Sequence, residues 1–137
     1  MAKRTAIKTA NTCRRCRALL SADRSVARGY GDRCWREKRR EDAERQALAT
    51  ATAAVDVSAF ADGSRVLDKA EQLILDGAIV PLRHEGAYLA NGSDGVSTYY
   101  VDTIENSCTC KAGQRLGRCN HLVAANILDH TAALLAA

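Results

Sequence analysis

Apolar positions in the segment after residue 64 recur with the spacing of a helix. They fall at i, i+1, i+4, i+7 and i+8, which places them along one helical face: Val66, Leu67, Ala70, Leu73 and Ile74. Ser64 is a suitable N-cap residue, and Gly77 is suited to end the helix. We therefore expect one amphipathic helix between these two positions.

A short sheet is predicted next. Residues 79–83 are predicted to form a short strand, and Pro81 within it indicates a position at a sheet edge, because proline cannot donate to a central ladder. Residues 87–89 and 98–101 are strand-like, and residues 91–95 between them carry the composition of a turn. This pattern predicts a β-hairpin.

The last segment predicts a second amphipathic helix, with Asn120 as its cap, His121 as its first residue and Cys119 just outside it. Its apolar face holds Val123, Ala124, Ile127, Leu128, Thr131, Leu134 and Leu135. His130 falls outside this face, so we expect it on the surface.

Residues 32–54 read as a long helix of a different kind. They are rich in helix-forming residues, and Glu41 stands four positions before Arg45. No broad apolar face is present, so we expect a solvated connector. The chain is then an α+β protein with a basic N-terminal module (1–36), a charged, alanine-rich connector (37–56) and a C-terminal domain (57–137).

Four metal-binding residue types converge near the C-terminus in the order C-x-C-x8-C-x-H: Cys108, Cys110, Cys119 and His121. In an extended segment residues i and i+2 point to the same side, so the first two cysteines can share one metal ion. Three thiolates and one imidazole are the ligand set of a closed structural zinc site. Unrelated buried thiols or disulfides are the alternative, but they do not account for the histidine.

These residues resemble the SWIM-type zinc finger, whose pattern is C-x-C, a variable spacer and C-x-H. The resemblance covers about residues 78–130 and includes the hairpin before the first cysteine pair and the helix that carries His121. It implies a module that binds nucleic acid or protein through a zinc-stabilised fold.

A second cluster lies near the N-terminus: Cys13, Cys16 and Cys34. The C-x2-C spacing is that of a zinc knuckle, and Gly29 and Gly31 allow a turn before Cys34 at a helix start. Knuckle, loop and helix resemble a treble-clef finger, and also a C-x2-C…G-x-G-x-x-C motif of small bacterial and phage proteins. The fourth ligand is open: the candidates are Glu37, Asp32, Asp23, His84, His130 or water.

The composition supports metal-assisted folding. Among 137 residues there are one Phe, one Trp and four Tyr, so bulky core material is scarce, whereas there are six cysteines. The N-terminus lacks the apolar stretch of a signal peptide, and no run has the length of a transmembrane helix. We therefore expect a cytoplasmic protein with reduced thiols, one Zn²⁺ at the C-terminal cluster and a second at the N-terminal cluster.

Charge is unevenly distributed. Residues 1–40 carry thirteen Lys and Arg against three acidic residues, whereas residues 41–137 carry seven against thirteen. Such a basic half favours a polyanionic partner, with a solubilising tail or contact to the acidic half as alternatives. The candidate phosphate contacts are Arg14, Arg15, Arg17, Arg28, Arg33, Arg36, Arg39 and Arg40, with Lys111, Arg115 and Arg118 between the C-terminal ligand pairs.

Catalytic motifs are absent from the sequence: there is no nucleophile elbow, phosphate loop or H-E-x-x-H. A zinc ion with four protein ligands has no position for a reacting water. We therefore expect a non-catalytic protein that binds nucleic acid or, alternatively, a protein–protein adaptor, with no small-molecule substrate and no membrane partner.

Overall fold

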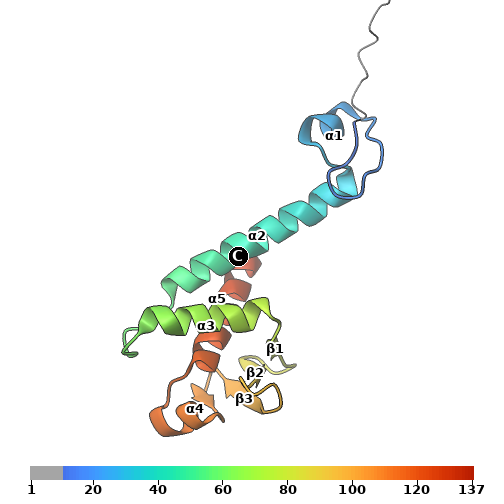
Figure 1. The fold of residues 1–137 in the computed structure, drawn as a ribbon. Helices are drawn as coiled ribbons and strands as arrows, with labels where there is room; N and C mark the ends of the chain where they lie inside the picture. Colours follow the sequence, from blue (N-terminus) through green and yellow to red (C-terminus); the bar gives the residue numbers. More distant parts are fainter. Residues whose placement is uncertain (1–10) are drawn as a thin grey trace, which may run out of the picture. The chain divides into compact units, whose positions relative to one another are not determined.

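The computed structural model describes residues 11–137, which form two compact units (Figure 1). The N-terminal unit is Met1–Ala43 and the C-terminal unit is Glu44–Ala137. Helix α2 (Asp32–Ala54) begins in the first unit and ends in the second, over the residues predicted. In the part of the chain described, no helix combines the length and apolarity needed to cross a membrane.

The N-terminal unit is built from a knuckle, the short helix α1 (Asp23–Arg28) and the start of α2. Backbone hydrogen bonds from Cys13 N to Ala18 O (2.8 Å) and from Arg14 N to Gly29 O (3.0 Å) tie the knuckle to itself and to the end of α1. Little apolar material is available to this unit. Its interior is instead organised around cysteines and around Arg28.

The C-terminal unit is α+β, as predicted. Its elements are α3 (Gly63–Leu75), β1 (Ile79–Pro81), β2 (Ala87–Asn91), β3 (Thr98–Asp102), β4 (Ser107–Cys108), α4 (Lys111–Leu116) and α5 (Asn120–Ala136). The four strands form one antiparallel sheet in the order β1-β2-β3-β4. Pro81 therefore lies on an edge strand and the hairpin is β2–β3, so both predictions are confirmed.

Both ends of α3 show how local sequence sets its bounds. The N-cap is Asp62, whose carboxylate accepts the Arg65 N–H at 3.0 Å, so the expectation of Ser64 was wrong by two residues. Aspartate and serine both cap helices well, and the propensity did not separate them. At the other end Gly77 has φ 65° and follows the cap residue, with hydrogen bonds from Gly77 N to Ile74 O and from Ala78 N to Leu73 O.

The core of the C-terminal unit lies between α3, α5 and the inner face of the sheet. Val101 on β3 and Ile127 on α5 are its largest fully buried side chains. Asp129 on α5 accepts hydrogen bonds from the hydroxyls of Tyr88 and Thr103, each at 2.5 Å, and so fastens this helix to the sheet region. Burial, together with this contact, raises the pKa of Tyr88.

Helix α5 is buried over a shorter length than its apolar pattern predicted. Its buried residues all lie between His121 and Ile127, whereas Leu134 and Leu135 are 37% and 46% exposed. The packing partners thus cover only the first half of the helix. The apolar face was correctly identified, but its extent depends on the length of neighbouring elements, which periodicity does not report.

The second half of α2 corrects the expectation of a solvated connector. Ala47 and Ala51 are buried, and Leu48 and Val55 pack against the core of the C-terminal unit. Alanine side chains let a helix approach its neighbours closely without a broad face of large apolar residues. The helix therefore contributes to the core through small side chains.

Replacing Ile127 by Ala should lower the free energy of unfolding of the metal-loaded protein by about 2–5 kcal/mol, because it leaves a cavity at a fully buried site. Leu135→Ala on the exposed end of the same helix is the control, and we expect a change within about 0.5 kcal/mol. Urea denaturation followed by circular dichroism measures both. Equal losses for the two variants would contradict the assigned core.

Candidate metal centres

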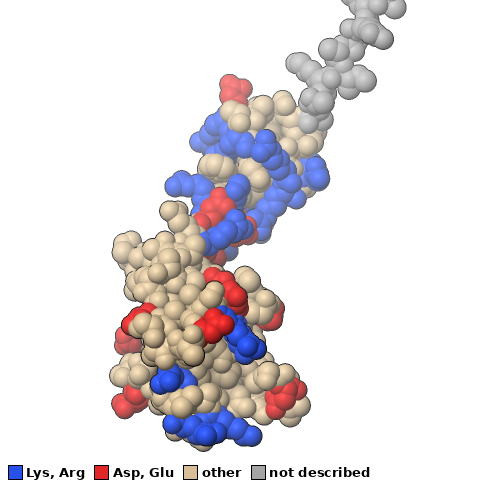
Figure 2. Space-filling view, turned by 60° about the vertical axis from the view of Figure 1, so that its left-hand side comes forward, with Lys and Arg blue, Asp and Glu red and all other residues tan. Residues whose placement is uncertain are grey.

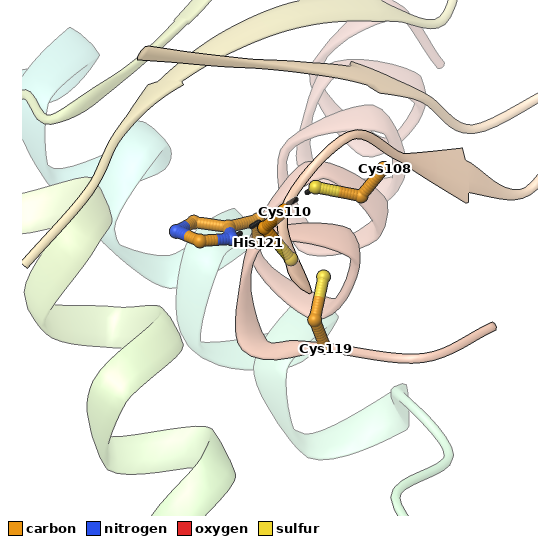
Figure 3. Close-up of side chains that lie close together, drawn as sticks. All are labelled: Cys108, Cys110, Cys119 and His121. Atoms are coloured by element: carbon orange, nitrogen blue, oxygen red, sulfur yellow. Dashed lines mark hydrogen bonds between the residues drawn. The ribbon is translucent and has the colours of Figure 1, made fainter. Parts of the chain in front are cut away.

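The C-terminal cluster brings together the four residues predicted from the sequence. Cys108 ends β4, Cys110 precedes α4, Cys119 precedes α5 and His121 lies in the first turn of α5. One donor atom from each lies within 4.8 Å of every other, and all four residues are buried. Figure 3 shows the three sulfur atoms and the imidazole converging on one point. The cluster can therefore hold a metal ion.

Two of these cysteines also cap helices. Cys110 Sγ accepts the N–H of Gly113 at 3.2 Å, and Cys119 Sγ accepts the N–H of Leu122 at 3.4 Å. N–H groups at a helix start favour a negative charge, so both positions suit a thiolate. The cap expected at Asn120 lies one residue earlier, because the sulfur of Cys119 takes that role.

The surroundings of His121 suit a neutral imidazole that could ligate a metal. Its Nδ1 lies 3.9 Å from Cys108 Sγ, and its ring packs 5.2 Å from that of Tyr99. Burial lowers the pKa of His121, while a hydrogen bond to the backbone of Asn91 acts weakly in the opposite sense. Such an outer hydrogen bond commonly orients a ligating histidine. Asn91 and Tyr99 come from the hairpin, and nothing in the ligand spacing marked them.

Burial also affects the thiols of this cluster. It raises the pKa of Cys108 and of Cys119, and the nearby side chain of Cys110 adds to both shifts. A cation among the sulfurs would remove this cost by stabilising the thiolates. With four protein donors there is no open coordination position, which is the arrangement of a structural site.

The N-terminal cluster joins the other three predicted cysteines. The sulfur atoms of Cys13, Cys16 and Cys34 lie within 4.8 Å of one another; Cys13 and Cys34 are buried and Cys16 is exposed. Backbone N–H groups of Cys16 and Gly31 lower the pKa of Cys13 to about 6. Burial and the adjacent thiols raise that of Cys34, to a pKa of about 11. These N–H groups therefore favour the thiolate form of Cys13.

No fourth His, Asp or Glu joins this group among residues 11–137. Residues 1–10, which the structure does not describe, contain none of these residue types and no cysteine. A pocket of about 400 Å³ opens beside the cluster, lined by Arg15, Cys16, Gly31, Asp32, Arg33, Cys34 and Glu37. Of the suggested fourth ligands, Asp32 and Glu37 line this pocket, whereas Asp23, His84 and His130 do not.

Most of the predicted phosphate contacts lie on the surface. The exposed ones are Arg14, Arg15, Arg17, Arg33, Arg36, Arg39 and Arg40 in the N-terminal unit, and Lys111, Arg115 and Arg118 in the C-terminal unit. Arg28 is different: only 19% of its side chain is exposed. It is bonded to Tyr30 O and Asp32, and it lies over the ring of Trp35. The structure places this arginine in the framework of the unit.

A second pocket, of about 620 Å³, adjoins the C-terminal cluster. Lys69 of α3 and Lys111 of α4 line it, together with Asn91, Tyr99 and Asn120. No motif pointed to Lys69, because it stands on α3, far in the sequence from the ligand residues.

Comparison with protein-family models, curated proteins and solved structures found no match to this chain. The assignment of the two clusters therefore rests on their residues and geometry.

Gly113 is the residue whose replacement should test the C-terminal geometry most directly. A Cβ there would lie 2.5 Å from the backbone oxygen of Cys108 and 2.8 Å from its Cβ. Gly113→Ala should therefore push Cys110 and Cys108 apart and weaken Zn²⁺ binding by at least about tenfold, as disturbing the surroundings of metal ligands does. Competition with a chromogenic chelator measures this.

Gln114→Ala, at the next and exposed position of α4, is the control and should bind Zn²⁺ like the parent chain. An unchanged affinity for Gly113→Ala would mean that α4 can shift away from Cys108 at no cost.

Proposed function

We propose that this chain is a non-catalytic zinc protein that binds nucleic acid, chiefly through its basic N-terminal unit and secondarily through a SWIM-type finger. The observation that carries the proposal is the exposure of seven arginines around a cysteine cluster that can hold a metal. A rigid, cationic knuckle offers phosphate oxygens several fixed donors.

Zinc is the metal that the donor sets favour. Thiolates with one imidazole are soft ligands, and a Cys3His set is typical of structural zinc. The resemblance to the SWIM-type pattern supports the same metal at the C-terminal cluster. At the N-terminal cluster, the knuckle followed by a cysteine near the start of α2 supports a treble-clef-like finger.

The charge distribution supports a polyanionic partner. Figure 2 shows Lys and Arg side chains gathered over the N-terminal unit, while the visible face of the C-terminal unit carries scattered charges of both signs. Arg17, Arg36 and Arg39 are exposed, and among residues 11–137 they form no ion pair. These three are the side chains most available to phosphates.

The pocket beside the C-terminal cluster supports a second contact. Lys69 and Lys111 at this pocket carry no ion pair among the described residues, and Tyr99 with the amides of Asn91 and Asn120 supplies an aromatic edge and polar groups. Lys111 and Arg115 would extend this surface along α4, and Arg118 would extend it past the end of that helix. Aromatic and amide groups beside ammonium groups suit a nucleotide.

A protein–protein adaptor is the second candidate, and one observation favours it. Val80, Leu89 and Tyr100 are paired across β1, β2 and β3, and all three are exposed on the outer face of the sheet. Such a row of apolar side chains suits a protein partner. Under this alternative both metal sites are purely structural.

Zinc binding by the C-terminal cluster should depend steeply on pH. The raised pKa values of Cys108 and Cys119 mean that both thiols are protonated near pH 7 in the metal-free chain, so binding must release at least two protons. Apparent affinity should then fall about hundredfold for each unit of pH lowered, or tenfold per proton. Chelator competition between pH 6.5 and 7.5 measures this on a Cys13→Ser, Cys16→Ser variant, which isolates the site.

The intact chain should carry two zinc ions by elemental analysis, and His121→Ala should carry one. An affinity that does not change with pH would show that the thiols are already ionised without metal.

Nucleic-acid binding should weaken with salt and with charge reversal in the N-terminal unit. Each neutralised phosphate contributes about −0.9 to the log–log salt slope for duplexes and about −0.7 for single strands. Arg36→Glu with Arg39→Glu should weaken binding to all sequences alike and make the slope shallower by about two duplex phosphates, because phosphate contacts position rather than specify. Fluorescence anisotropy with single- and double-stranded DNA and RNA, at several salt concentrations, measures the affinity and its salt slope.

The matched control is Arg65→Glu with Arg83→Glu, which changes the net charge equally on exposed residues of the C-terminal unit. Arg115→Glu with Arg118→Glu reports the contribution of the finger. Equal effects of all three pairs would indicate a non-specific charge effect, and no binding at low salt would leave the adaptor as the function.

A further inference from the structure

The N-terminal cluster supplies three sulfur ligands, and zinc held structurally takes four. Among residues 11–137 no fourth His, Cys, Asp or Glu donor lies within 4.8 Å of the three sulfurs, and residues 1–10 contain none of these residue types. The pocket beside Cys16 and Cys34 is lined by two carboxylates, those of Asp32 and Glu37. The fourth ligand is therefore to be sought between these two side chains or in solvent.

Asp32 is already committed to other partners. Its carboxylate accepts a hydrogen bond from Arg28 and another from Arg24 at 2.8 Å. Arg28 is largely buried and also bonds Tyr30 O, so its position is fixed. Moving the Asp32 carboxylate to a metal would break both ion pairs. It would leave the largely buried guanidinium of Arg28 without its acidic partner.

Glu37 has weaker ion pairs than Asp32. It stands one turn after Cys34 on α2, and residues three apart share a helix face. Its carboxylate lies 3.2 Å from Arg33 Nε and 3.5 Å from Arg15 Nε. Arg33 is 85% exposed, so that pair contributes little. Arg15 has a shorter bond, 2.8 Å, to Glu41 Oε1, and it keeps this bond if Glu37 moves away.

We propose that Glu37 is the fourth ligand of the N-terminal metal centre, and that its carboxylate turns from Arg15 and Arg33 to the cysteines when the metal binds. The inference rests on the proposed metal binding of this cluster. Carboxylate oxygen is an ordinary zinc ligand beside thiolates. Arg15 would remain beside the bound carboxylate as an outer partner, and the centre would have no position for exchangeable solvent.

The test compares Glu37→Ala with Glu41→Ala in the full chain. Both remove a carboxylate that pairs with Arg15, one turn apart on α2, but only Glu37 lines the pocket beside the cysteines. Chelator competition should show that Glu37→Ala weakens the N-terminal Zn²⁺ site by at least about tenfold. Glu41→Ala should change it by about twofold or less, because Glu41 does not line the pocket and its ion pair with Arg15 is exposed.

Azide binding to the Co²⁺-loaded protein, followed by visible absorption, distinguishes a metal ligand from a residue that acts on the site only through its charge. With Glu37 as ligand, azide should leave the absorption bands of the Co²⁺-loaded parent chain and of Glu41→Ala unchanged. It should alter those of Glu37→Ala, where a position is vacated. Zinc affinity unaffected by Glu37→Ala, or azide binding to the parent chain, would overturn the inference. Uptake of a single zinc ion by the parent chain, with Cys13 and Cys34 open to alkylation, would instead remove the N-terminal site itself.

Discussion

The C-terminal unit depends on one electrostatic constraint: three thiols and an imidazole are buried within 4.8 Å of one another. Thiolates packed so closely repel one another, and neutral thiols would leave the adjoining helix N–H groups with weak acceptors. A cation would resolve both problems, and it would fix three elements at once because its donors come from β4 and from the starts of α4 and α5. The core continues from there, since Val101 lies opposite Cys108 in the sheet.

Two cysteines of this cluster have a second role, because they also set where the neighbouring helices begin. Cys110 and Cys119 cap α4 and α5, so the spacer between the two ligand pairs is a short helix rather than a loose loop. Gly113 lets that helix lie directly against Cys108. The exposed Lys111 and Arg115 on α4 are thereby held at fixed positions beside the cluster, which is how a structural metal can position a binding surface.

Periodicity and ligand spacing predicted α3, the hairpin, the edge position of Pro81 and both cysteine clusters, because each depends on residues close in sequence. The predictions failed where burial depends on contacts with elements that are distant in the sequence. Ala47 and Ala51 were taken as solvated because alanine carries no amphipathic signal, yet both are buried, and Ala51 belongs to the core of the C-terminal unit. Leu134 and Leu135 had the right period but lie beyond the buried part of α5. The contacts of His121 with Asn91 and Tyr99 join segments about twenty residues and more apart, and no local pattern reports them.

In the N-terminal unit the same charged residues serve the fold and the surface. Arg15 stands inside the knuckle and pairs with Glu37 and Glu41, while Arg33 stands beside Cys34 and pairs with Glu37. A phosphate that approaches these guanidiniums competes with the carboxylates for them. If Glu37 moved to a metal as proposed, Arg33 would lose its carboxylate and gain capacity for a phosphate, so that metal and polyanion would favour each other. Linkage would make this reciprocal: a bound polyanion would raise the affinity for the metal by the same factor.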